Sequence, residues 1–507
     1  MAETKRIAKN TLVLYFRMFI TMVVGLYMAR VVLSALGEID YGIYGVVATF
    51  VTSFGIISGA MATATQRFLS FEIGKTEDSN VKAVFSTAIV IHLRLAAVVL
   101  VVGEIIGVWF LNFHMNFPPE RYEAANWVFQ LSLLTFVVNI YSVPYNAALV
   151  AYEKMTAFAY VAILEVVLKL IVAIVISYSD GDRLILYAIL IAAIAVVVRI
   201  IYGIYVKTHM PECRCTWRLN KSYSKEMTSF VGWNLVGSLA NTAKDQGVNI
   251  VLNLFFGAAV NSARAIAYQV MGAISAFATN FQMALNPQII KSYAAGETDD
   301  MFKLVFRGSK FSYMLLLMLS LPVIIEAEYI LDLWLVDVPE HTVMFLRLVL
   351  CTVLIDSLSN ALVTAMHASG KVRDYQIVVG GISLLTLPTV YVALSMGNSP
   401  EWALAIGLAF AIVCHVARLI MLRISIDLDI AEFICKVTLR VGATTIVAAI
   451  APTLLYMSCD VNIVTFIAVC ATAVASTAVS AFLIGIDSKE RSEITAFVRR
   501  KLKMKER

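Results

Sequence analysis

The sequence predicts an all-α integral membrane protein made by duplication, with two pseudo-symmetric six-helix lobes followed by two further helices. Its composition is 60% hydrophobic and only 15% charged, with a mean hydropathy of +0.81. A soluble domain must cover its surface with polar side chains, so this composition is too apolar for one. Long apolar stretches recur along the chain, and one polar block occurs twice among them. These three observations together predict the fold class.

Fourteen stretches are long and apolar enough to be predicted as transmembrane helices. A spanning helix needs about 20 mostly apolar residues, because its backbone groups can be satisfied only internally in the hydrocarbon region. The predicted spans are 11–33, 41–66, 83–112, 123–150, 155–177, 184–205, 227–256, 261–290, 304–325, 341–367, 374–396, 401–422, 441–457 and 462–486.

The duplication is visible in a block of about 30 residues whose two copies lie about 220 residues apart. The first copy runs through Gln66 to GKTEDSNVKAVF (74–85), and the second through Gln288 to GETDDMFKLVF (296–306). A weaker pair, NAALVAYEKM (146–155) and NALVTAMHASGKV (360–372), follows spans four and ten. Six is an even number of spans, so both halves should share one orientation about an axis along the membrane normal.

The distribution of basic residues predicts that both termini are cytoplasmic. With these spans, the two termini and every second loop carry 27 of the 40 Lys and Arg residues, while the opposite loops carry only Arg121 and Arg183. Such asymmetry follows the positive-inside rule. The N-terminal segment also lacks the pattern of a cleaved secretory signal, so we expect the first span to be retained.

The spans predict five regions: an N-terminal lobe (1–205), a cytoplasmic linker (206–226), a C-terminal lobe (227–424), two additional helices (437–486) and a basic tail (487–507). The linker carries Trp217, Tyr223 and Met227 among basic residues, which fits either a helix on the anionic leaflet or an ordinary solvated loop. Apolar residues at helical spacing in the tail predict an amphipathic helix: Ile494, Phe497, Val498 and Leu502.

Several activities are not expected. The predicted exterior loops are too short for a catalytic domain, and the chain has no phosphate-binding G-x-x-x-x-G-K-[ST] loop, so we expect no enzyme and no nucleotide-driven pump. The seven cysteines include one C-x-C pair, Cys213 and Cys215, without the further ligands of a zinc site. We therefore expect no metal site, no cofactor and no nucleic-acid partner.

Eleven basic residues lie inside predicted spans, where a charge costs roughly 2.5–3.5 kcal/mol on insertion scales. Seven lie near span ends and are expected to extend to the interface: Arg30, Arg199, Arg264, Arg307, Lys310, Arg347 and Arg418. Lys169 follows Glu165 by one helical turn and can be neutralised by it. Arg17, Arg94 and Lys244 remain as deep cations, and we expect them at the wall of a cavity.

Span seven has a polar stripe at helical spacing: Asn234, Ser238, Asn241, Asp245, Asn249 and Asn253. Span eight adds Gln269, Thr279, Asn280, Gln282 and Asn286. We interpret the stripe as the lining of a hydrated cavity that binds substrate, and the alternative is hydrogen bonding between spans seven and eight. Amides and cations suit a substrate with hydroxyl groups and an acidic head.

The deep acids Glu104, Asp245 and Asp356 are candidates to bind a coupling proton or sodium ion. Glu165 is a fourth deep acid, beside Lys169. Five prolines lie within spans, and we interpret Pro287, next to the repeated block, as either a hinge or a static bend.

Four stretches resemble a known family: NTLVLYFRMFITMVVGLYMARVVLSALGEIDYGIYGVV (10–47), NSARAIAYQV (261–270), FATNFQMALNPQIIKSYAAGE (277–297) and HASGKVRDYQIVVG (367–380). They are similar to the polysaccharide and lipopolysaccharide biosynthesis flippases, the Wzx-like transporters of the multidrug/oligosaccharidyl-lipid/polysaccharide (MOP) exporter superfamily. The resemblance covers nearly the whole chain. It implies a MATE/MOP-like fold of two six-helix lobes and two further helices.

The resemblance implies a flippase that moves an undecaprenyl-diphosphate-linked oligosaccharide from the cytoplasmic to the outer leaflet of a bacterial inner membrane by alternating access. Expected partners are this lipid-linked oligosaccharide, membrane lipids and other polysaccharide-assembly proteins. The main alternative is a MATE-type cation-coupled multidrug exporter. A membrane glycan polymerase or ligase is disfavoured, because it requires a large exterior loop with catalytic residues.

Overall fold

The computed structural model describes residues 2–52, 54–113, 115, 117–335, 337–460, 462–488, 490–492 and 495. The described part of the chain is almost entirely helical and contains no β-strand. Eleven of its helices are long and apolar enough to cross a membrane. The protein is therefore a multi-pass membrane protein of the all-α class, as the sequence predicts.

The chain divides into two compact units, Arg6–Leu235 and Val236–Arg507 together with Met1–Lys5. We call them the N-terminal and the C-terminal unit. The division falls inside helix α8 (Lys221–Phe256), which is later in the sequence than the predicted linker 206–226. The first turns of α8 are packed in the N-terminal unit, where the ring of Phe230 lies 6.0 Å from that of Phe68.

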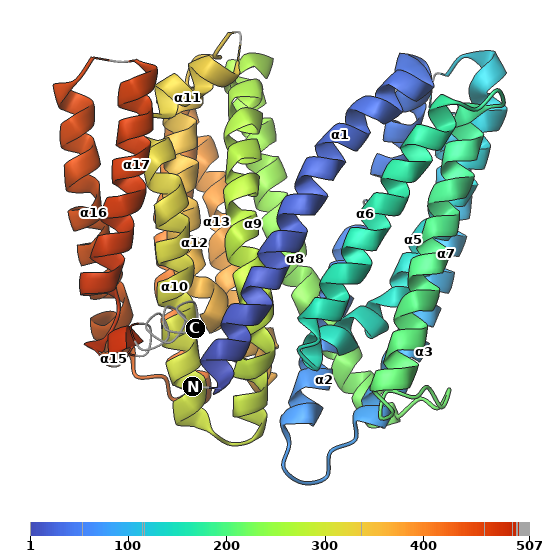
Figure 1. Ribbon diagram of the computed structural model, residues 1–507, viewed down its shortest axis with the longest axis horizontal. Coiled ribbons are helices and arrows are strands. Elements are labelled where there is room, and N and C mark those ends of the chain that lie inside the picture. Colours follow the sequence, from blue (N-terminus) through green and yellow to red (C-terminus); the bar gives the residue numbers. More distant parts are fainter. Residues whose placement is uncertain are drawn as a thin grey trace, which may run out of the picture. The chain divides into compact units, whose positions relative to one another are not determined.

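The N-terminal unit contains the first set of helices (Figure 1). They are α1 (Ala2–Thr52), α2 (Gly55–Gly74), α3 (Val81–Val102), the π-helical turn η1 (Gly103–Gly107), α4 (Val108–Phe113), the 3-10 turn η2 (Pro119–Arg121), α5 (Tyr122–Ala151), α6 (Met155–Ser177) and α7 (Arg183–His209). Helix α5 contacts α2, α3 and α7, and its buried face includes Val128, Phe129 and Leu133.

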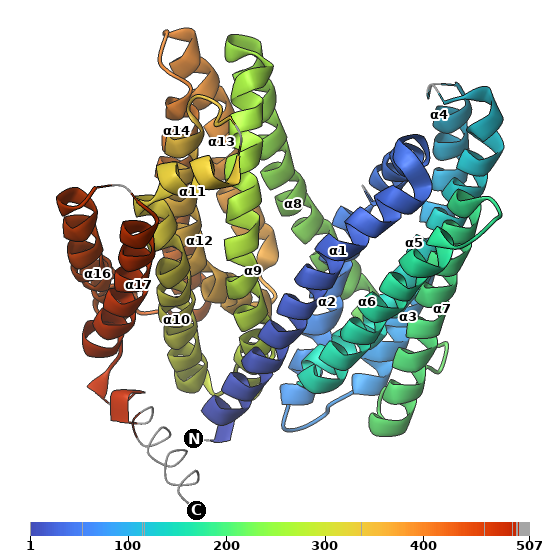
Figure 2. The same ribbon diagram turned by 45° about the horizontal axis from the view of Figure 1, so that its top comes forward.

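The C-terminal unit contains most of α8 and all later helices. They are α9 (Ala258–Ala294), α10 (Thr298–Ile325), α11 (Ala327–Trp334), α12 (Thr342–Ser369), α13 (Val372–Ser395), α14 (Glu401–Ile426), α15 (Ile430–Phe433), η3 (Ile434–Thr438), α16 (Leu439–Ser458), α17 (Ile463–Ser480) and η4 (Ala481–Gly485). Helix α12 contacts α9, α10 and α14, and the two added helices α16 and α17 lie beside α10 (Figure 2).

The fourteen predicted spans do not all appear as apolar spanning helices, so that count stays a prediction. Three of them, 41–66, 227–256 and 261–290, are absent from the eleven apolar helices of the described chain. The first is divided between the end of α1 and α2. The other two are the long helices α8 and α9, whose amide and charged side chains make them less apolar.

Matching backbone angles confirm the duplication. The first two predicted spans are joined at Gly37 (φ 77°, ψ 171°), and spans seven and eight are joined at Gly257 (φ 79°, ψ −171°). Glycine suits both positions, because a Cβ is unfavourable at positive φ. Lys154 before α6 (φ −81°, ψ 51°) likewise matches Lys371 before α13 (φ −82°, ψ 54°).

The residues preceding these lysines are also left-handed, and they differ in chemistry. Gly370 has φ 76°, whereas its counterpart Glu153 has φ 58° despite its side chain. The Glu153 side chain is only 3% exposed, and Arg6 Nε lies 2.7 Å from its Oε2. This ion pair offsets part of the backbone strain at Glu153.

The five prolines predicted within spans lie inside continuous helices, including Pro287 in α9. In this structure Pro287 therefore belongs to an unbroken helix, and its role as a hinge or a static bend stays a prediction.

Both basic residues of the predicted exterior loops hold helix ends together in the N-terminal unit. Arg121 donates to Asp40 and, over 2.7 Å, to Asp182, and Arg183 donates to the carbonyl of Ala35 at 3.1 Å. Burial by itself would raise the pKa of Asp182, but hydrogen bonds from Arg121 and from two backbone N–H groups keep that pKa below its ordinary value. Since Asp182 stays ionised, these contacts persist at neutral pH.

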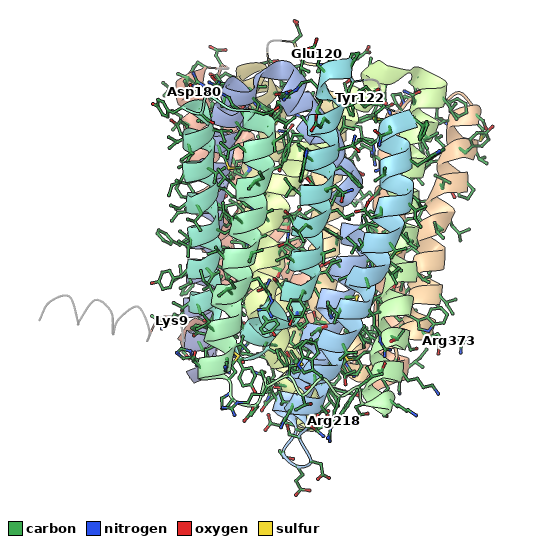
Figure 3. All side chains as sticks on the ribbon, turned by 90° about the vertical axis from the view of Figure 1, so that its right-hand side faces the viewer. Lys9, Glu120, Tyr122, Asp180, Arg218 and Arg373 are labelled. Carbon is green, nitrogen blue, oxygen red and sulfur yellow. The ribbon has the colours of Figure 1, made fainter. Side chains whose placement is uncertain are left out.

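The two ends of the N-terminal unit differ as the charge asymmetry predicts. In Figure 3, Glu120, Tyr122 and Asp180 lie at one end of this unit, and Lys9 and Arg218 lie at the other. This separation is consistent with the predicted topology.

The linker after α7 is packed on the N-terminal unit, and its residues 211–220 are not helical. Ser86 Oγ accepts from the backbone N–H of Thr216 at 3.1 Å, and Thr87 Oγ1 accepts from that of Asn220 at 3.2 Å. Burial raises the pKa of the Cys213 thiol to about 12, which makes this cysteine a poor metal ligand and nucleophile. The structure thus disagrees with the leaflet-helix interpretation for residues 211–220, which are not helical and are held on α3 by these hydrogen bonds.

The segment after α17 is fixed to α10 and α16 by five charged side chains, which we call the C-terminal ion cluster: Arg307, Lys310, Arg440, Asp487 and Glu490. Lys310 is 1% exposed, and its Nζ lies 2.8 Å from Glu490 Oε2. Glu490 Oε2 also accepts from the backbone N–H of Asp487 at 2.8 Å, as in a helix N-terminal cap. The tail residues Ile494, Phe497, Val498 and Leu502, predicted to form an amphipathic helix, lie outside the described residues.

We expect Glu490→Gln to lower the free energy of unfolding by roughly 3 kcal/mol, because it leaves the buried Lys310 ammonium with an incomplete counter-charge. The exposed pair Asp300 and Lys303 on the same helix provides a matched control, and Asp300→Asn should cause no measurable change. SDS-induced unfolding of the purified protein in mixed micelles measures both. Equal stability of the two variants would contradict a stabilising role for the C-terminal ion cluster.

Candidate functional site

The C-terminal unit contains two adjoining cavities of roughly 360 and 350 Å³, which we treat together as the C-terminal cavity. Helices α8, α12, α13 and α14 line both parts, and α9 and α10 contribute to the first. The residues shared by the two parts are Lys244, Asp245, Thr352, Asp356, Asn360, Thr386 and Gly407. Such a volume accommodates a small polar group with several waters.

The middle of α8 forms one wall of this cavity. Asn241, Lys244 and Asp245 line it, as the polar stripe of span seven predicts. Asn241 Nδ2 donates to the carbonyl of Gly237 at 3.1 Å, and its Oδ1 accepts from Ser383 Oγ on α13 at 3.1 Å. Its orientation is thus fixed by two protein contacts. Asp245 keeps 45% of its side chain exposed, so its carboxylate remains accessible.

Asp356 on α12 lies across the cavity from this wall, among side chains of both charges. Arg418 of α14 approaches it with an Nη1 to Oδ1 distance of 3.8 Å. Lys244 and Asp245 are also close enough to interact with its charge. Two of the three predicted ion-binding acids, Asp245 and Asp356, are therefore brought together by the fold.

Arg264 on α9 is buried to 8% exposure at the edge of the cavity. Its Nη1 donates to Asn249 Oδ1 at 3.3 Å and its Nη2 to the backbone carbonyl of Asp245 at 3.2 Å. Its guanidinium also stacks 4.2 Å from the ring centre of Tyr268. Among the residues that the structure describes, no carboxylate lies within ion-pair distance of Arg264. This makes Arg264 a buried cation without a counter-anion.

Two residues that line the cavity were predicted to lie at the membrane interface. Arg264 and Arg418 were expected to extend out from span ends, yet both line the cavity. Position along a helix indicates depth, whereas the direction of a side chain depends on rotation about the helix axis. Tyr268, one helical turn after Arg264, was the available signal for that residue, since Arg side chains stack on aromatic rings, whereas Tyr375 lies 43 residues from Arg418 on another helix and gives no such signal.

Several predicted site residues of α9 contribute to helix packing and do not line the cavity. Gln282 Nε2 donates to Ser312 Oγ of α10 at 2.5 Å, and Asn286 Oδ1 accepts from Thr364 Oγ1 of α12 at 2.9 Å. Asn280 is buried and donates to the carbonyl of Ala276 within its own helix at 2.8 Å. Gln269 is exposed and absent from the cavity lining. Gln282 and Asn286 thus join α9 to α10 and α12 by hydrogen bonds, whereas the hydrogen bonds between spans seven and eight are those that Asn261 and Arg264 donate to Asn249.

The remaining predicted site residues belong to the N-terminal unit. Asn234 is buried on the first part of α8. Arg17 lies 4.9 Å from the ring centre of Phe158 on α6, and Arg94 is exposed on α3. Glu104, within the π-helical turn η1, accepts from Gln130 Nε2 at 2.9 Å. None of the four lines the C-terminal cavity.

Gln282, which bonds to α10, and Gln269, which is exposed, allow the side-chain directions on α9 to be tested. We expect Gln282→Leu to destabilise the protein by roughly 0.6–1.7 kcal/mol, the range measured for hydrogen bonds between membrane helices, because it removes the partner of the Ser312 hydroxyl. Gln269→Leu, on an exposed face of the same helix, should leave stability unchanged. SDS-induced unfolding compares the two, and a larger loss from Gln269→Leu would show that the side-chain directions on α9 are misassigned.

Comparison with known proteins adds to this geometry. The MatE family model matches residues 14–175. A search of curated proteins found no match.

Several solved structures share the fold. An outward-facing multidrug resistance MATE family transporter of the MOP superfamily superimposes with a TM-score of 0.72 at 12% identity, covering 83% of this chain and 95% of that one. A variant of the Vibrio cholerae MATE transporter VcmN gives 0.69 at 18% identity, covering 84% and 98%. A MOP superfamily transporter from Pyrococcus furiosus gives 0.67 at 12% identity, covering 85% and 96%.

Likeness at these identities establishes the fold. The chain therefore has the fold of the MATE transporters of the MOP superfamily, and its residues 14–175 match the MatE family model.

Proposed function

We propose that this protein is a flippase that carries an undecaprenyl-diphosphate-linked oligosaccharide from the cytoplasmic to the outer leaflet of a bacterial inner membrane during surface polysaccharide synthesis. The transport cycle is alternating access, driven by an ion gradient or by the gradient of the substrate. The observation that carries this proposal is the buried Arg264 cation, which lines the C-terminal cavity and has no carboxylate within ion-pair distance in the described part of the chain.

A buried guanidinium without a counter-anion favours an anionic substrate. A buried charge without a counter-charge is costly in a low-dielectric interior, and an arriving anion removes that cost. The cavity holds three cations, Lys244, Arg264 and Arg418, and two carboxylates, Asp245 and Asp356. The surplus positive charge supports binding of a phosphate or of an acidic sugar, because guanidinium forms paired hydrogen bonds with such oxyanions.

The other polar side chains of the cavity suit a glycan. Thr352, Asn360 and Thr386 present hydroxyl and amide groups to both of its parts. A sugar carries many hydroxyl groups that donate and accept at once, and each needs a partner when it leaves water. This lining therefore supports a hydroxylated substrate over a purely apolar one.

The second candidate is a MATE-type cation-coupled multidrug exporter. The half-exposed carboxylates Asp245 and Asp356 favour it, since they attract a cationic drug, and a solved protein of the same fold is described as a multidrug resistance transporter. The Pyrococcus furiosus transporter is described as having a binding pocket of reverse polarity, which suggests a different function for that protein. Pocket polarity is thus the property that distinguishes the candidates, and here the surplus charge is positive.

Deleting the gene from its native host discriminates between the two functions. For a flippase we expect loss of surface glycan, because its lipid-linked precursor stays on the cytoplasmic leaflet, together with unchanged sensitivity to cationic drugs. Immunostaining of surface polysaccharide and drug susceptibility assays measure the two effects. Increased drug sensitivity with normal surface glycan would overturn the flippase proposal in favour of the exporter.

Replacing Arg264 tests the observation that carries the proposal. We expect Arg264→Gln to reduce glycan display by roughly tenfold or more, because the substrate anion loses its charge-assisted hydrogen bonds. Arg264→Lys should retain part of the activity, since it keeps the charge but not the planar donor pair. Arg423→Gln, at an exposed arginine on α14, serves as the control. Normal glycan display by Arg264→Gln at wild-type membrane abundance would exclude Arg264 as the anion-binding group.

A further inference from the structure

The two carboxylates of the C-terminal cavity each lie beside a basic side chain of the same cavity. Lys244 Nζ is 3.5 Å from Asp245 Oδ1, and Arg418 Nη1 is 3.8 Å from Asp356 Oδ1. Both acids are candidates for a coupling ion, and both have a protein cation close to their oxygens. The following inference rests on the proposed function, because it concerns how the same cavity is coupled to ions.

The Arg418–Asp356 contact is asymmetric. The Arg418 side chain is 16% exposed, and its Nε donates to the Tyr375 hydroxyl at 3.2 Å. The Asp356 side chain is 51% exposed. The Tyr375 hydroxyl of α13 thus holds the Arg418 side chain, whereas the Asp356 carboxylate is accessible from the cavity. At 3.8 Å the two charges attract each other, but the distance is too long for a hydrogen bond.

We propose that Arg418 is a tethered cation that occupies the ion position at Asp356, so that this carboxylate binds no dissolved metal cation in the wild-type protein. A side-chain cation satisfies the charge of Asp356 without an ion entering from solution. Arg418 thereby determines the ion specificity of the cavity. Removing its charge leaves the Asp356 carboxylate beside hydroxyl and amide groups, which are the oxygen donors that hard cations prefer, and beside the Lys244–Asp245 pair, whose two charges offset each other.

The surroundings of Asp356 support a latent cation site. Thr352, Ser359 and Asn360 of the same helix α12 line the cavity with it. Ser359 Oγ is engaged with His415 Nδ1 at 2.8 Å, and Thr352 and Asn360, one helical turn before and one after Asp356, are the other neutral polar side chains of α12 in this part of the cavity. Thr352 donates its hydroxyl proton to the Leu348 carbonyl at 2.9 Å, so its lone pairs remain available. A monovalent cation such as Na⁺ could therefore take oxygen ligands at this position once Arg418 is neutral.

The test measures Na⁺ binding by thermal unfolding of the purified full-length protein in detergent, without substrate. NaCl is compared with choline chloride at equal ionic strength. For the wild type we expect the same midpoint in both salts. For Arg418→Gln we expect Na⁺ to raise the midpoint by roughly 2–4 °C at concentrations well above its dissociation constant, with saturation.

Two further variants make the assignment specific. Arg418→Lys keeps the charge and should stay insensitive to Na⁺, and Arg418→Gln combined with Asp356→Asn should lose the Na⁺ effect. A wild-type protein stabilised by Na⁺ would overturn the proposal, whether or not Arg418→Gln folds, and so would a folded Arg418→Gln without Na⁺ stabilisation. Because no substrate is present, either failure leaves the flippase proposal to be decided by the glycan assays.

Discussion

The structure depends on one constraint: a charge inside a membrane bundle must find a partner, because the surrounding hydrocarbon cannot solvate it. The three cations of the C-terminal cavity meet this constraint in two ways. Arg418 is paired with Asp356 and the hydroxyl of Tyr375. Lys244 lies beside Asp245. Arg264 has backbone and amide oxygens and an aromatic ring but no carboxylate. Carboxylates of the protein itself neutralise Arg418 and Lys244. Arg264 is the cation whose charge, in the proposed function, is neutralised by a bound substrate anion.

The same constraint determines how the helix ends are joined. At the end of the N-terminal unit that contains Glu120, the carboxylates Asp40 and Asp182 share Arg121. In the C-terminal unit, Lys310 is almost fully buried and is neutralised by Glu490. Both clusters link segments that are distant in sequence. Charges that would be costly alone thereby become specific contacts that fix where loops and added helices pack.

The sequence predicts the broad architecture well because the membrane imposes strong patterns. Span length, the asymmetry of Lys and Arg, and the repeated blocks require no knowledge of packing, and the backbone at Gly37 and Gly257 confirms the duplication. Part of the site was also predictable, since Asn241, Lys244 and Asp245 follow one another at helical spacing on α8 and line the cavity. A stripe on a helix that is otherwise apolar must face something polar.

The rest of the site could not be predicted because a single helix offers several polar directions. Gln269 and Gln282 are 13 residues apart on α9, which at about 100° per residue places them roughly 140° apart around the axis. Gln269 is exposed and Gln282 bonds to α10, although the sequence pattern gives the same prediction for both. Arg264 and Arg418 were misassigned for the same reason. Which face meets a cavity depends on the packing of neighbouring helices, and that is a property of several segments together.

At one position of the repeat, both copies hold another chain segment in place, but they do so with different side chains. Counted from the shared Val84–Phe85 and Val305–Phe306 pairs, Ser86 of α3 corresponds to Arg307 of α10. In the N-terminal unit, Ser86 and Thr87 hold the chain that follows α7 by hydrogen bonds. In the C-terminal unit, Arg307 and Lys310 hold the chain that follows α17 by ion pairs. Neutral hydroxyls suffice for a segment that offers backbone N–H groups, whereas the segment after α17 offers carboxylates and requires cations. The two attached segments are not equivalent in the repeat, because α7 ends the first set of helices and α17 is one of the two added helices. The side chains at this position therefore differ because the segment that each copy must hold is different.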